Sequence, residues 1–236
     1  MVWSIKDSSS QYQYFAIISA CSYTWVGMSN LLTQQNIYPI RVMHQGEEIN
    51  AEEKMIISEE GQAQLAVFLN GDICAILATL KKLVLLLDFS AARNDVTIFS
   101  ELPACWLYGT LFALLTNKSK LQCVHLGFSG LACHSIIAGH FPLVELAARR
   151  DIRPGFCLDA GLSVRELNAV LHYYQGYSVK YQSQLSGLAG KTIYTHRQQG
   201  MKKLSGLQQW LHDAAMTRVL NRRRRNGGQR AVSSFF

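Results

Sequence analysis

Residues 163–204 read SVRELNAVLHYYQGYSVKYQSQLSGLAGKTIYTHRQQGMKKL, and this stretch decides the fold of the second half of the chain. Ser163 and Glu166 form the Ser-x-x-Glu pattern of a capping box, which opens a helix. Apolar side chains then recur at helical spacing, at Val164, Leu167, Val170 and Leu171. Gly176 ends this first helix and Gly190 permits another turn, so the stretch predicts three short helices joined by tight turns.

The third predicted helix, which we expect to start at Thr192, lies in a segment without acid. Residues 190–204 contain no Asp or Glu, whereas the whole chain has 16 of them. One side of the helix gathers Ile193, Gly200 and Leu204, and the other presents hydroxyls, amides and a cation. Such side chains meet base edges and phosphates in the major groove of DNA. The predicted DNA contacts are Lys180, Lys191, Thr192, Tyr194, Thr195, Arg197, Gln198, Gln199, Lys202 and Lys203.

Charge separates the two halves of the 236-residue chain. Of the net charge of +7, residues 151–236 carry +9 and residues 1–150 carry −2. A basic second half favours a polyanionic partner, here double-stranded DNA. No apolar run reaches about 18 residues, so we expect no membrane span. The six cysteines form no Cys-x-x-Cys pair and indicate a reducing compartment, so we expect a cytoplasmic, nucleoid-associated protein.

The first half alternates short apolar runs with helical patterns. The runs predict strands at 14–21, 38–44, 83–89, 110–116 and 129–134, and the patterns predict helices at 25–32, 61–82, 94–107, 119–127 and 142–150. Continuously apolar strands between helices indicate a parallel sheet covered on both faces. Five such units predict an α/β doubly wound, flavodoxin-like domain.

This order of elements resembles the receiver domain of bacterial response regulators. The resemblance places Asp88 at the phosphoacceptor position after strand three, and it places Ser19 and Ala20 where two acidic residues would hold Mg²⁺. Thr116 matches the hydroxyl position after strand four, and His134 replaces the lysine of strand five. Without the acidic pair a transferred phosphoryl group is uncompensated. We therefore predict a degenerate receiver-like domain in which Asp88 is not phosphorylated.

The second half resembles the LuxR/NarL (FixJ)-type helix-turn-helix domain over about 55 residues. The residues that carry the resemblance are Leu162, Ser163, Arg165, Glu166, Val170, Leu171, Gly176, Ser178, Lys180, Thr192, Ile193, His196, Lys203 and Leu204. It implies an all-α four-helix domain whose third helix enters the major groove, acting as a dimer.

The middle helix departs from that pattern. Polar residues stand where the family has aliphatic or small ones, at Gln182, Ser183 and Ser186, and Ala189 replaces a frequent capping serine. Tyr181, Leu185 and Leu188 instead form an apolar stripe displaced by one residue. We predict a scaffold helix rotated by about 100°, the angle between successive residues.

The stretch ACSYTWVGM, residues 20–28, is similar to the RcsA-like family of auxiliary regulators of capsule synthesis. That resemblance implies a heterodimer with an RcsB-like response regulator, and a homodimer remains open.

Together these patterns divide the chain into an N-terminal extension (1–13), a receiver-like domain (14–150), a linker (151–161), a helix-turn-helix domain (162–215) and a basic tail (216–236). We expect a transcriptional regulator without enzymatic activity, cofactor or metal. Two alternatives are a protein-interaction adaptor whose helix-turn-helix no longer reads sequence, and a phosphorylated response regulator.

Three catalytic or metal-binding interpretations are weaker. A phosphate-binding loop ending at Gly190-Lys191-Thr192 would need glycine at Leu185. Cys123, His125, Cys133 and His134 do not have the spacing of a known zinc finger. No nucleophile elbow of a serine or cysteine hydrolase is present.

Overall fold

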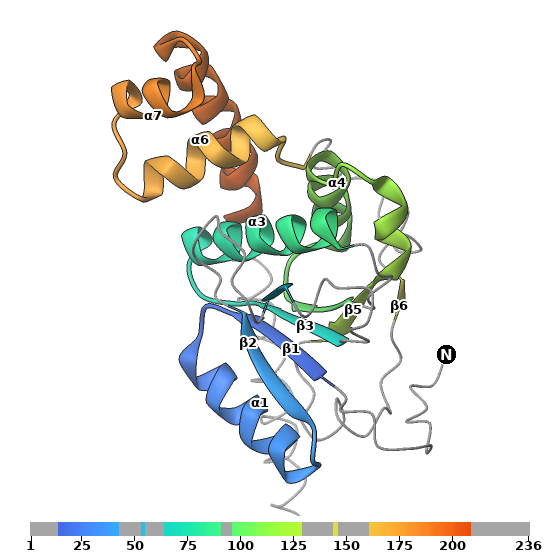
Figure 1. The fold of residues 1–236 in the computed structure, drawn as a ribbon. Helices are drawn as coiled ribbons and strands as arrows, with labels where there is room; N and C mark the ends of the chain where they lie inside the picture. The colour runs from blue at the N-terminus through green and yellow to red at the C-terminus, as the bar shows by residue number, and fades with distance from the viewer. Residues whose placement is uncertain are drawn as a thin grey trace, which may run out of the picture.

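The computed structural model describes residues 14–42, 53–54, 64–90, 96–128, 144–145 and 161–208. These residues form a sheet with helices on its faces and a group of helices packed beside it (Figure 1). The sheet belongs to the first half of the chain and the helical group to residues 161–208.

Six strands form one sheet in the order β2-β1-β3-β4-β5-β6. Their bounds are β1 Tyr14–Ser19, β2 Tyr38–Val42, β3 Gln64–Leu69, β4 Val96–Ser100, β5 Val124–Phe128 and β6 Val144–Glu145. The first five strands pair in parallel, and β6 is antiparallel to β5. The order 2-1-3-4-5 is that of the flavodoxin-like fold, so the predicted architecture of this half is confirmed.

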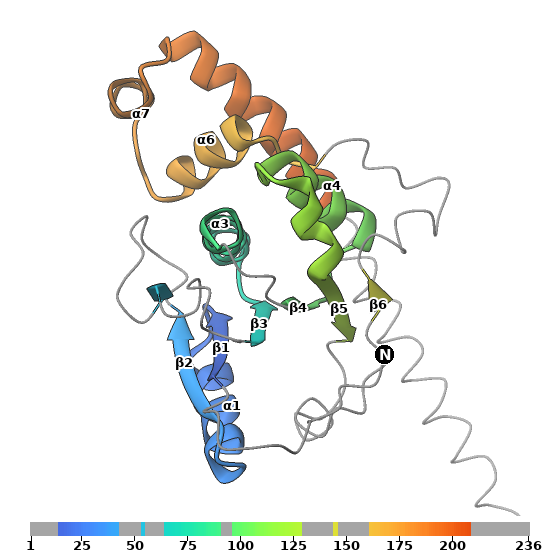
Figure 2. The same cartoon turned by 45° about the vertical axis from the view of Figure 1, so that its right-hand side comes forward.

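Helices cover both faces of the sheet (Figure 2). Helix α1 (Ser22–Gln34) packs through Met28 and Leu32 on Phe15 and Ile17 of β1. The alternate residues of the same strand face the opposite side, where α3 (Ile73–Phe89) and α4 (Ala104–Leu114) lie. This alternation follows from the two-residue period of a strand.

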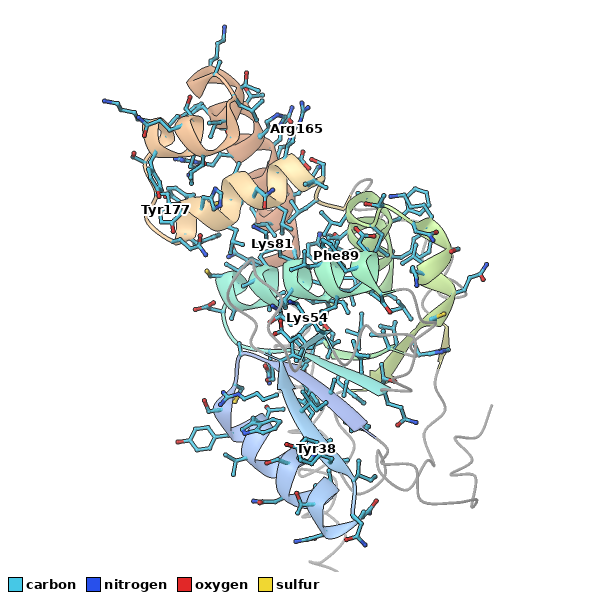
Figure 3. All side chains as sticks on the ribbon, viewed as in Figure 1. Tyr38, Lys54, Lys81, Phe89, Arg165 and Tyr177 are labelled. Carbon is cyan, nitrogen blue, oxygen red and sulfur yellow. The ribbon has the colours of Figure 1, made fainter. Side chains whose placement is uncertain are left out.

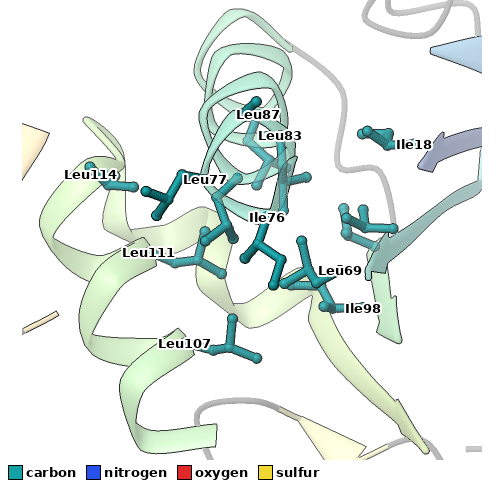
Figure 4. Packing of buried hydrophobic residues seen from close by; sticks show 14 of the residues in the cluster. Ile18, Leu69, Ile76, Leu77, Leu83, Leu87, Ile98, Leu107, Leu111 and Leu114 are labelled. Atoms are coloured by element: carbon teal, nitrogen blue, oxygen red, sulfur yellow. The ribbon is translucent and has the colours of Figure 1, made fainter. Parts of the chain in front are cut away.

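Helix α3 is the centre of the larger core (Figure 4). Asp72 caps its first turn, since the side chain accepts a hydrogen bond of 2.7 Å from the backbone N–H of Ala75. Leu77, Leu80 and Leu83 are fully buried, and the same cluster continues through Leu111 of α4 into the helical group at residues 162–207. Helix α3 is therefore covered by the sheet on one side and by residues of the helical group on the other.

This double burial explains the wrong predictions for residues 61–89. Residues 64–69 are a strand rather than part of a helix, and residues 83–89 are the second half of α3 rather than a strand. A helix covered on two sides is apolar around much of its circumference, and a short apolar run of this kind does not distinguish helix from strand. The turn at Gly71 (φ 97°) and the Asp72 cap mark the true boundary.

The predicted helices and strands of residues 94–127 are also displaced from the observed ones. The helix expected at 94–107 contains β4 and only the start of α4, and the strand expected at 110–116 falls largely within α4. The helix expected at 119–127 is a 3₁₀ helix, η1 (Lys118–Cys123), followed by β5. The strand expected at 129–134 lies outside the described residues. Within 142–150, the structure describes only β6, a strand where we expected a helix.

None of the helices among the described residues is both long enough and apolar enough to span a bilayer.

Candidate nucleic-acid interface

The described residues 161–208 contain three helices, as the pattern of residues 163–204 predicts, and the remainder of the four-helix domain expected at 162–215 lies outside the described residues. The three helices are α6 (Val164–Tyr174), α7 (Val179–Ser186) and a helix at 190–208, which starts two residues before Thr192. The predicted capping box is present: Ser163 Oγ accepts a hydrogen bond from Glu166 N, and Glu166 Oε2 accepts one of 2.8 Å from Ser163 N. Ser178 Oγ caps α7 by accepting a hydrogen bond of 3.2 Å from the backbone N–H of Tyr181. Gly176 (φ 82°) lies in the turn before α7, and Gly187 (φ 68°) ends that helix.

Helix α6 and the 190–208 helix share an apolar centre that fixes the orientation of the latter. Ile193 and Leu204 of this helix are buried, as are Leu167 and Val170 of α6. Gly200 lies where the two helices are closest, because a Cβ there would come within 2.6 Å of the Val170 side chain. This close approach aims the opposite side of the 190–208 helix away from α6 and towards solvent.

Helix α7 does not rotate as predicted. Gln182 is buried, with 2% of its surface exposed, whereas Tyr181 and Leu185 are 46% and 55% exposed. The prediction of a stripe of Tyr181, Leu185 and Leu188 facing inward is therefore wrong for its first two residues. The buried amide is satisfied in part: Gln182 Nε2 donates a hydrogen bond of 3.0 Å to the carbonyl of Tyr177, whereas Oε1 has no hydrogen-bond partner among the described residues.

The outward side of the 190–208 helix is polar and cationic. Its exposed residues are Lys191, Tyr194, Thr195, Gln198, Gln199 and Lys202, and we call them the polar face. Thr192 is half-buried at the edge of this face. The Thr195 hydroxyl donates a hydrogen bond to the carbonyl of Lys191 (3.0 Å), so this hydroxyl is turned back towards its own helix. Outside this helix, Lys180 is exposed in the first turn of α7.

Two of the predicted DNA contacts are directed inward. Lys203 Nζ lies 2.7 Å from Glu166 Oε2 and also donates to the carbonyl of Gly161 (3.2 Å). The Arg197 guanidinium lies 4.7 Å from the ring centre of Tyr173 on α6, and its Nε and Nη2 are buried without a hydrogen-bond partner among the described residues. Both residues are therefore left out of the polar face, because Lys203 is paired with Glu166 and the Arg197 guanidinium lies over Tyr173.

Burial of Glu166 would by itself raise the pKa of this carboxyl. The hydrogen bonds from Lys203 and Ser163 outweigh that effect and lower the pKa below its ordinary value. The carboxylate is therefore charged at neutral pH, and it links the start of α6 to the 190–208 helix. Glu166 and Lys203 are far apart in the sequence, and the capping-box pattern alone did not predict their contact.

The ribbon shows that the N-terminal part of the 190–208 helix lies at the end of the helical group far from the sheet (Figure 3). Helix α6 lies between α7 and α3 (Figure 1), and the C-terminal end of the 190–208 helix contributes Leu204 and Leu207 to the core shared with α3 and α4. The sheet domain thus contacts the helical group through its inner side and leaves the polar face accessible.

At the carboxyl edge of the sheet, the assignment of Asp88 to the phosphoacceptor position is wrong. Strand β3 ends at Leu69, so Asn70, and not Asp88, occupies the phosphoacceptor position. The Asn70 amide donates to Thr24 Oγ1 (3.1 Å) and accepts from Ser19 Oγ (3.4 Å). Strand β4 ends at Ser100, which takes the hydroxyl position assigned to Thr116.

Asp88 instead lies in the last turn of α3. Its carboxylate accepts hydrogen bonds from the backbone N–H (2.9 Å) and hydroxyl (3.0 Å) of Thr116, which follows α4. Asp88 therefore ties two helices together. His134, predicted at the lysine position of strand five, lies outside the described residues.

Within the part of the chain that the structure describes, no three His, Cys, Asp or Glu side chains are placed to hold a metal ion. Cys133 and His134 of the zinc interpretation fall outside that part.

No protein-family model matches the sequence, and the comparison with curated proteins gives no match. Solved structures of response regulators are similar at low identity. A structure of two RcsB dimers bound to two parallel DNAs is 13% identical, with a TM-score of 0.42 over 82% of this chain and 92% of that chain. RcsB from Salmonella enterica serovar Typhimurium bound to promoter P1flhDC with a phosphomimetic is 13% identical (TM-score 0.42, 83% and 93% covered). Full-length FixJ from B. japonicum is 14% identical (TM-score 0.33, 88% and 99% covered). Values this low do not establish a family for the chain.

Proposed function

We propose that the protein is a transcriptional regulator that reads the major groove of double-stranded DNA with the polar face of the 190–208 helix. The observation that carries the proposal is the side-chain chemistry of this face. Glutamine amides pair with adenine edges, a threonine methyl contacts a thymine methyl, and lysine ammoniums neutralise phosphates. The face contains Gln198, Gln199 and Thr195 between Lys191 and Lys202, and all five are exposed.

The charge distribution supports the same function. The +9 charge of residues 151–236 favours association with a polyanion over residues 1–150, whose charge is −2. We infer that the protein acts in the cytoplasm at the nucleoid, without enzymatic activity, cofactor or metal.

We further propose that regulation does not use phosphorylation of the receiver-like domain. Asn70 replaces the nucleophilic carboxylate at the acceptor position, and Ser19 and Ala20 provide no carboxylates for Mg²⁺. A dimer provides two half-site contacts, and its second subunit is either another copy of this chain or an RcsB-like response regulator.

The test is genome-wide occupancy of the wild type and of a Thr195→Ala/Gln198→Ala double variant, with and without any RcsB-like partner. Thr33→Ala/Gln34→Ala on α1 is a matched control, because Thr33 makes the same hydroxyl-to-carbonyl bond (2.8 Å, to Ser29) on an exposed helix surface. We expect discrete peaks for wild type and control that disappear in the Thr195/Gln198 variant. Partner-dependent peaks would assign the heterodimer.

One observation favours the alternative function of a protein-interaction adaptor. Tyr181 and Leu185 are exposed on α7, and Tyr177, which precedes the cap of this helix, is exposed as well. Exposed aromatic and leucine side chains are common in protein contacts. An adaptor would still bind DNA through its positive charge, but with a low ratio of specific to non-specific affinity. Diffuse occupancy that the Thr195/Gln198 variant does not change would support the adaptor.

A further inference from the structure

Three aromatic rings contact one another around the turn between α6 and α7. The ring centres of His172 and Tyr177 are 5.3 Å apart, and those of Tyr177 and Tyr181 are 5.0 Å apart with the ring planes at 87°. Tyr177 and Tyr181 expose 39% and 46% of their surface, whereas Leu167 and Leu171 of α6 are buried. An edge-to-face contact covers one face of one ring only, so the pair leaves its other ring faces uncovered. We call His172, Tyr177 and Tyr181 the aromatic row.

Local hydrogen bonds fix the position of the aromatic row. Gly176 (φ 82°) reverses the chain after α6, and the backbone N–H of Tyr177 donates to the carbonyl of His172 (2.9 Å), which returns Tyr177 to the last turn of α6. The Tyr177 carbonyl accepts a hydrogen bond from Gln182 Nε2 (3.0 Å) on α7, the helix that carries Tyr181. The tyrosines are thus held by their backbone while their rings reach solvent. A rigid exposed ring loses little conformational freedom when it binds a partner.

The charges of this part of the chain are cationic. Residues 161–208 contain six Lys and Arg, and their one acidic residue is already paired with a lysine at 2.7 Å. Lys180 is exposed and lies between the two tyrosines of the aromatic row in the sequence. Next to the row, the Arg197 guanidinium lies 4.7 Å from the ring centre of Tyr173, which is itself 45% exposed. Aromatic rings interleaved with cations, without an unpaired carboxylate among these residues, are complementary to a polyanion.

The aromatic rings favour one form of nucleic acid over the other. A tyrosine ring stacks on the flat face of a base, and such stacking tolerates any base because every base has this face. In a duplex the neighbouring base pairs cover these faces, so the rings have nothing to stack on. A single strand exposes the faces and keeps the phosphates that Lys180 can neutralise. The aromatic row is therefore suited to unpaired bases, whereas the polar face is suited to the edges of paired ones.

We propose that the aromatic row is a binding site for single-stranded nucleic acid, in which bases stack on Tyr177 and Tyr181 and a phosphate lies beside Lys180. Sites that combine stacking rings with positive charge bind single strands with little sequence preference, and we expect the same of this site. The aromatic row and the polar face share no residue, so this site does not rest on the proposed function. A strand of opened DNA and an RNA share the same chemistry, and their relative affinities decide between them.

The test measures the binding of a fluorescently labelled oligothymidylate to the full chain, with an abasic strand of the same length as the reference. A length of about 12 nucleotides lies within the site sizes of proteins that bind single strands. The abasic strand keeps every phosphate and lacks the bases, so we expect the wild type to bind it more weakly. Tyr177→Ala and Tyr181→Ala should each reduce the affinity for oligothymidylate about tenfold, the effect of one lost stacking contact, and leave the affinity for the abasic strand unchanged.

Three matched variants serve as controls. Tyr181→Phe retains the ring and should bind as the wild type does, which separates stacking from hydrogen bonding by the hydroxyl. Tyr23→Ala removes a tyrosine that is 90% exposed on α1, and we expect no effect. Thr195→Ala/Gln198→Ala should leave oligothymidylate binding unchanged, because this variant tests only the proposed function. Tighter binding of an oligouridylate of the same length would assign RNA as the ligand, and tighter binding of oligothymidylate would assign opened DNA.

A further variant keeps the proposal testable if the alanine variants perturb the turn between α6 and α7. Lys180→Met should weaken both strands and decrease the slope of log affinity against log salt by about 0.7, the value for one phosphate of a single strand. Equal affinity of the wild type for oligothymidylate and the abasic strand would overturn the proposal. Folded Tyr177→Ala and Tyr181→Ala variants that bind oligothymidylate as tightly as the wild type would overturn it as well, and would leave these side chains to the protein contact of an adaptor.

Discussion

Two neighbouring lysines should have different roles, although the sequence offers no reason to separate them. Lys202 is exposed on the polar face, whereas Lys203 binds Glu166 at 2.7 Å and the carbonyl of Gly161 at 3.2 Å. We expect Lys203→Met to destabilise the protein without a direct effect on the DNA-contacting surface. Lys202→Met should do the reverse.

The expected magnitude follows from the environment of the ion pair. A hydrogen bond to a charged group contributes about 1.5–3 kcal/mol, and the lower end applies because the Lys203 side chain is 27% exposed. A loss of about 2 kcal/mol corresponds to a decrease in Tm of roughly 4–8 °C in a chain of this size. For Lys202→Met we expect a change of less than about 0.5 kcal/mol, as for other surface substitutions.

The assays are thermal unfolding and DNA binding across a range of salt concentrations. Losing Lys202 should decrease the slope of log affinity against log salt by about 1, since one fewer phosphate is neutralised. The advantage of the wild type over Lys203→Met should also depend on pH. The pKa of Glu166 is lower in the folded protein, so this stabilisation is complete above pH 4.5 and is lost as the pH falls through the folded-state pKa. Equal Tm values for the two variants, together with equal losses of DNA affinity, would refute the structural role of Lys203.

Three further outcomes are expected. Gly200→Val should cost about 1–3 kcal/mol in urea unfolding, because its Cβ meets the Val170 side chain at 2.6 Å, whereas Gly27→Ala on α1, where the added Cβ has no neighbour within 4 Å, should not destabilise. Gly161→Ala should separate the helical group from α4 and increase its proteolytic release, since the added Cβ would overlap the Thr110 backbone; an unchanged digestion pattern would contradict this docking. Mass spectrometry after incubation with acetyl phosphate and Mg²⁺ should detect no phosphorylated protein, and a phosphorylated Asp88 would contradict the structural role given to that residue.

The three helices of residues 161–208 were predictable because their signals are local. The capping box at Ser163, the turn at Gly176 and the spacing of apolar residues each act within one or two helical turns. The receiver-like fold was predictable as a class but not in its register. Helix α3 packs on the sheet on one side and on the helical group on the other. Its apolar residues therefore lie around most of its circumference, which conceals the 3.6-residue period of an amphipathic helix. Residue pairs such as Lys203 and Glu166 depend on tertiary packing and have no signature in the sequence.

The burial of Gln182 is a second feature that the sequence did not predict. Its sequence position and the apolar stripe of Tyr181 and Leu185 favoured a rotated α7, since leucine is buried more often than glutamine. In the fold, the serine cap at residue 178 and the left-handed Gly187 fix both ends of this eight-residue helix. The rotation of α7 is therefore set by its turns, and the hydrogen bond from Gln182 Nε2 to Tyr177 O only partly compensates the burial of the amide, because Oε1 has no partner among the described residues.

Asn70 at the end of β3 limits how this protein can be regulated. A carboxylate at the end of β3 could have been switched by phosphorylation, but a neutral amide held between Ser19 and Thr24 has neither the charge nor the nucleophilicity for that step. Among the described residues, contact between the sheet domain and the helical group runs through α3 and α4 against residues 161–207. A change in the packing of α6 on α3 or α4 is therefore one way in which the described residues can transmit a signal between these parts. A variant at this interface, such as Leu85→Trp on α3, should consequently alter DNA affinity although Leu85 is not part of the polar face, and Val26→Trp on the exposed surface of α1 should leave it unchanged.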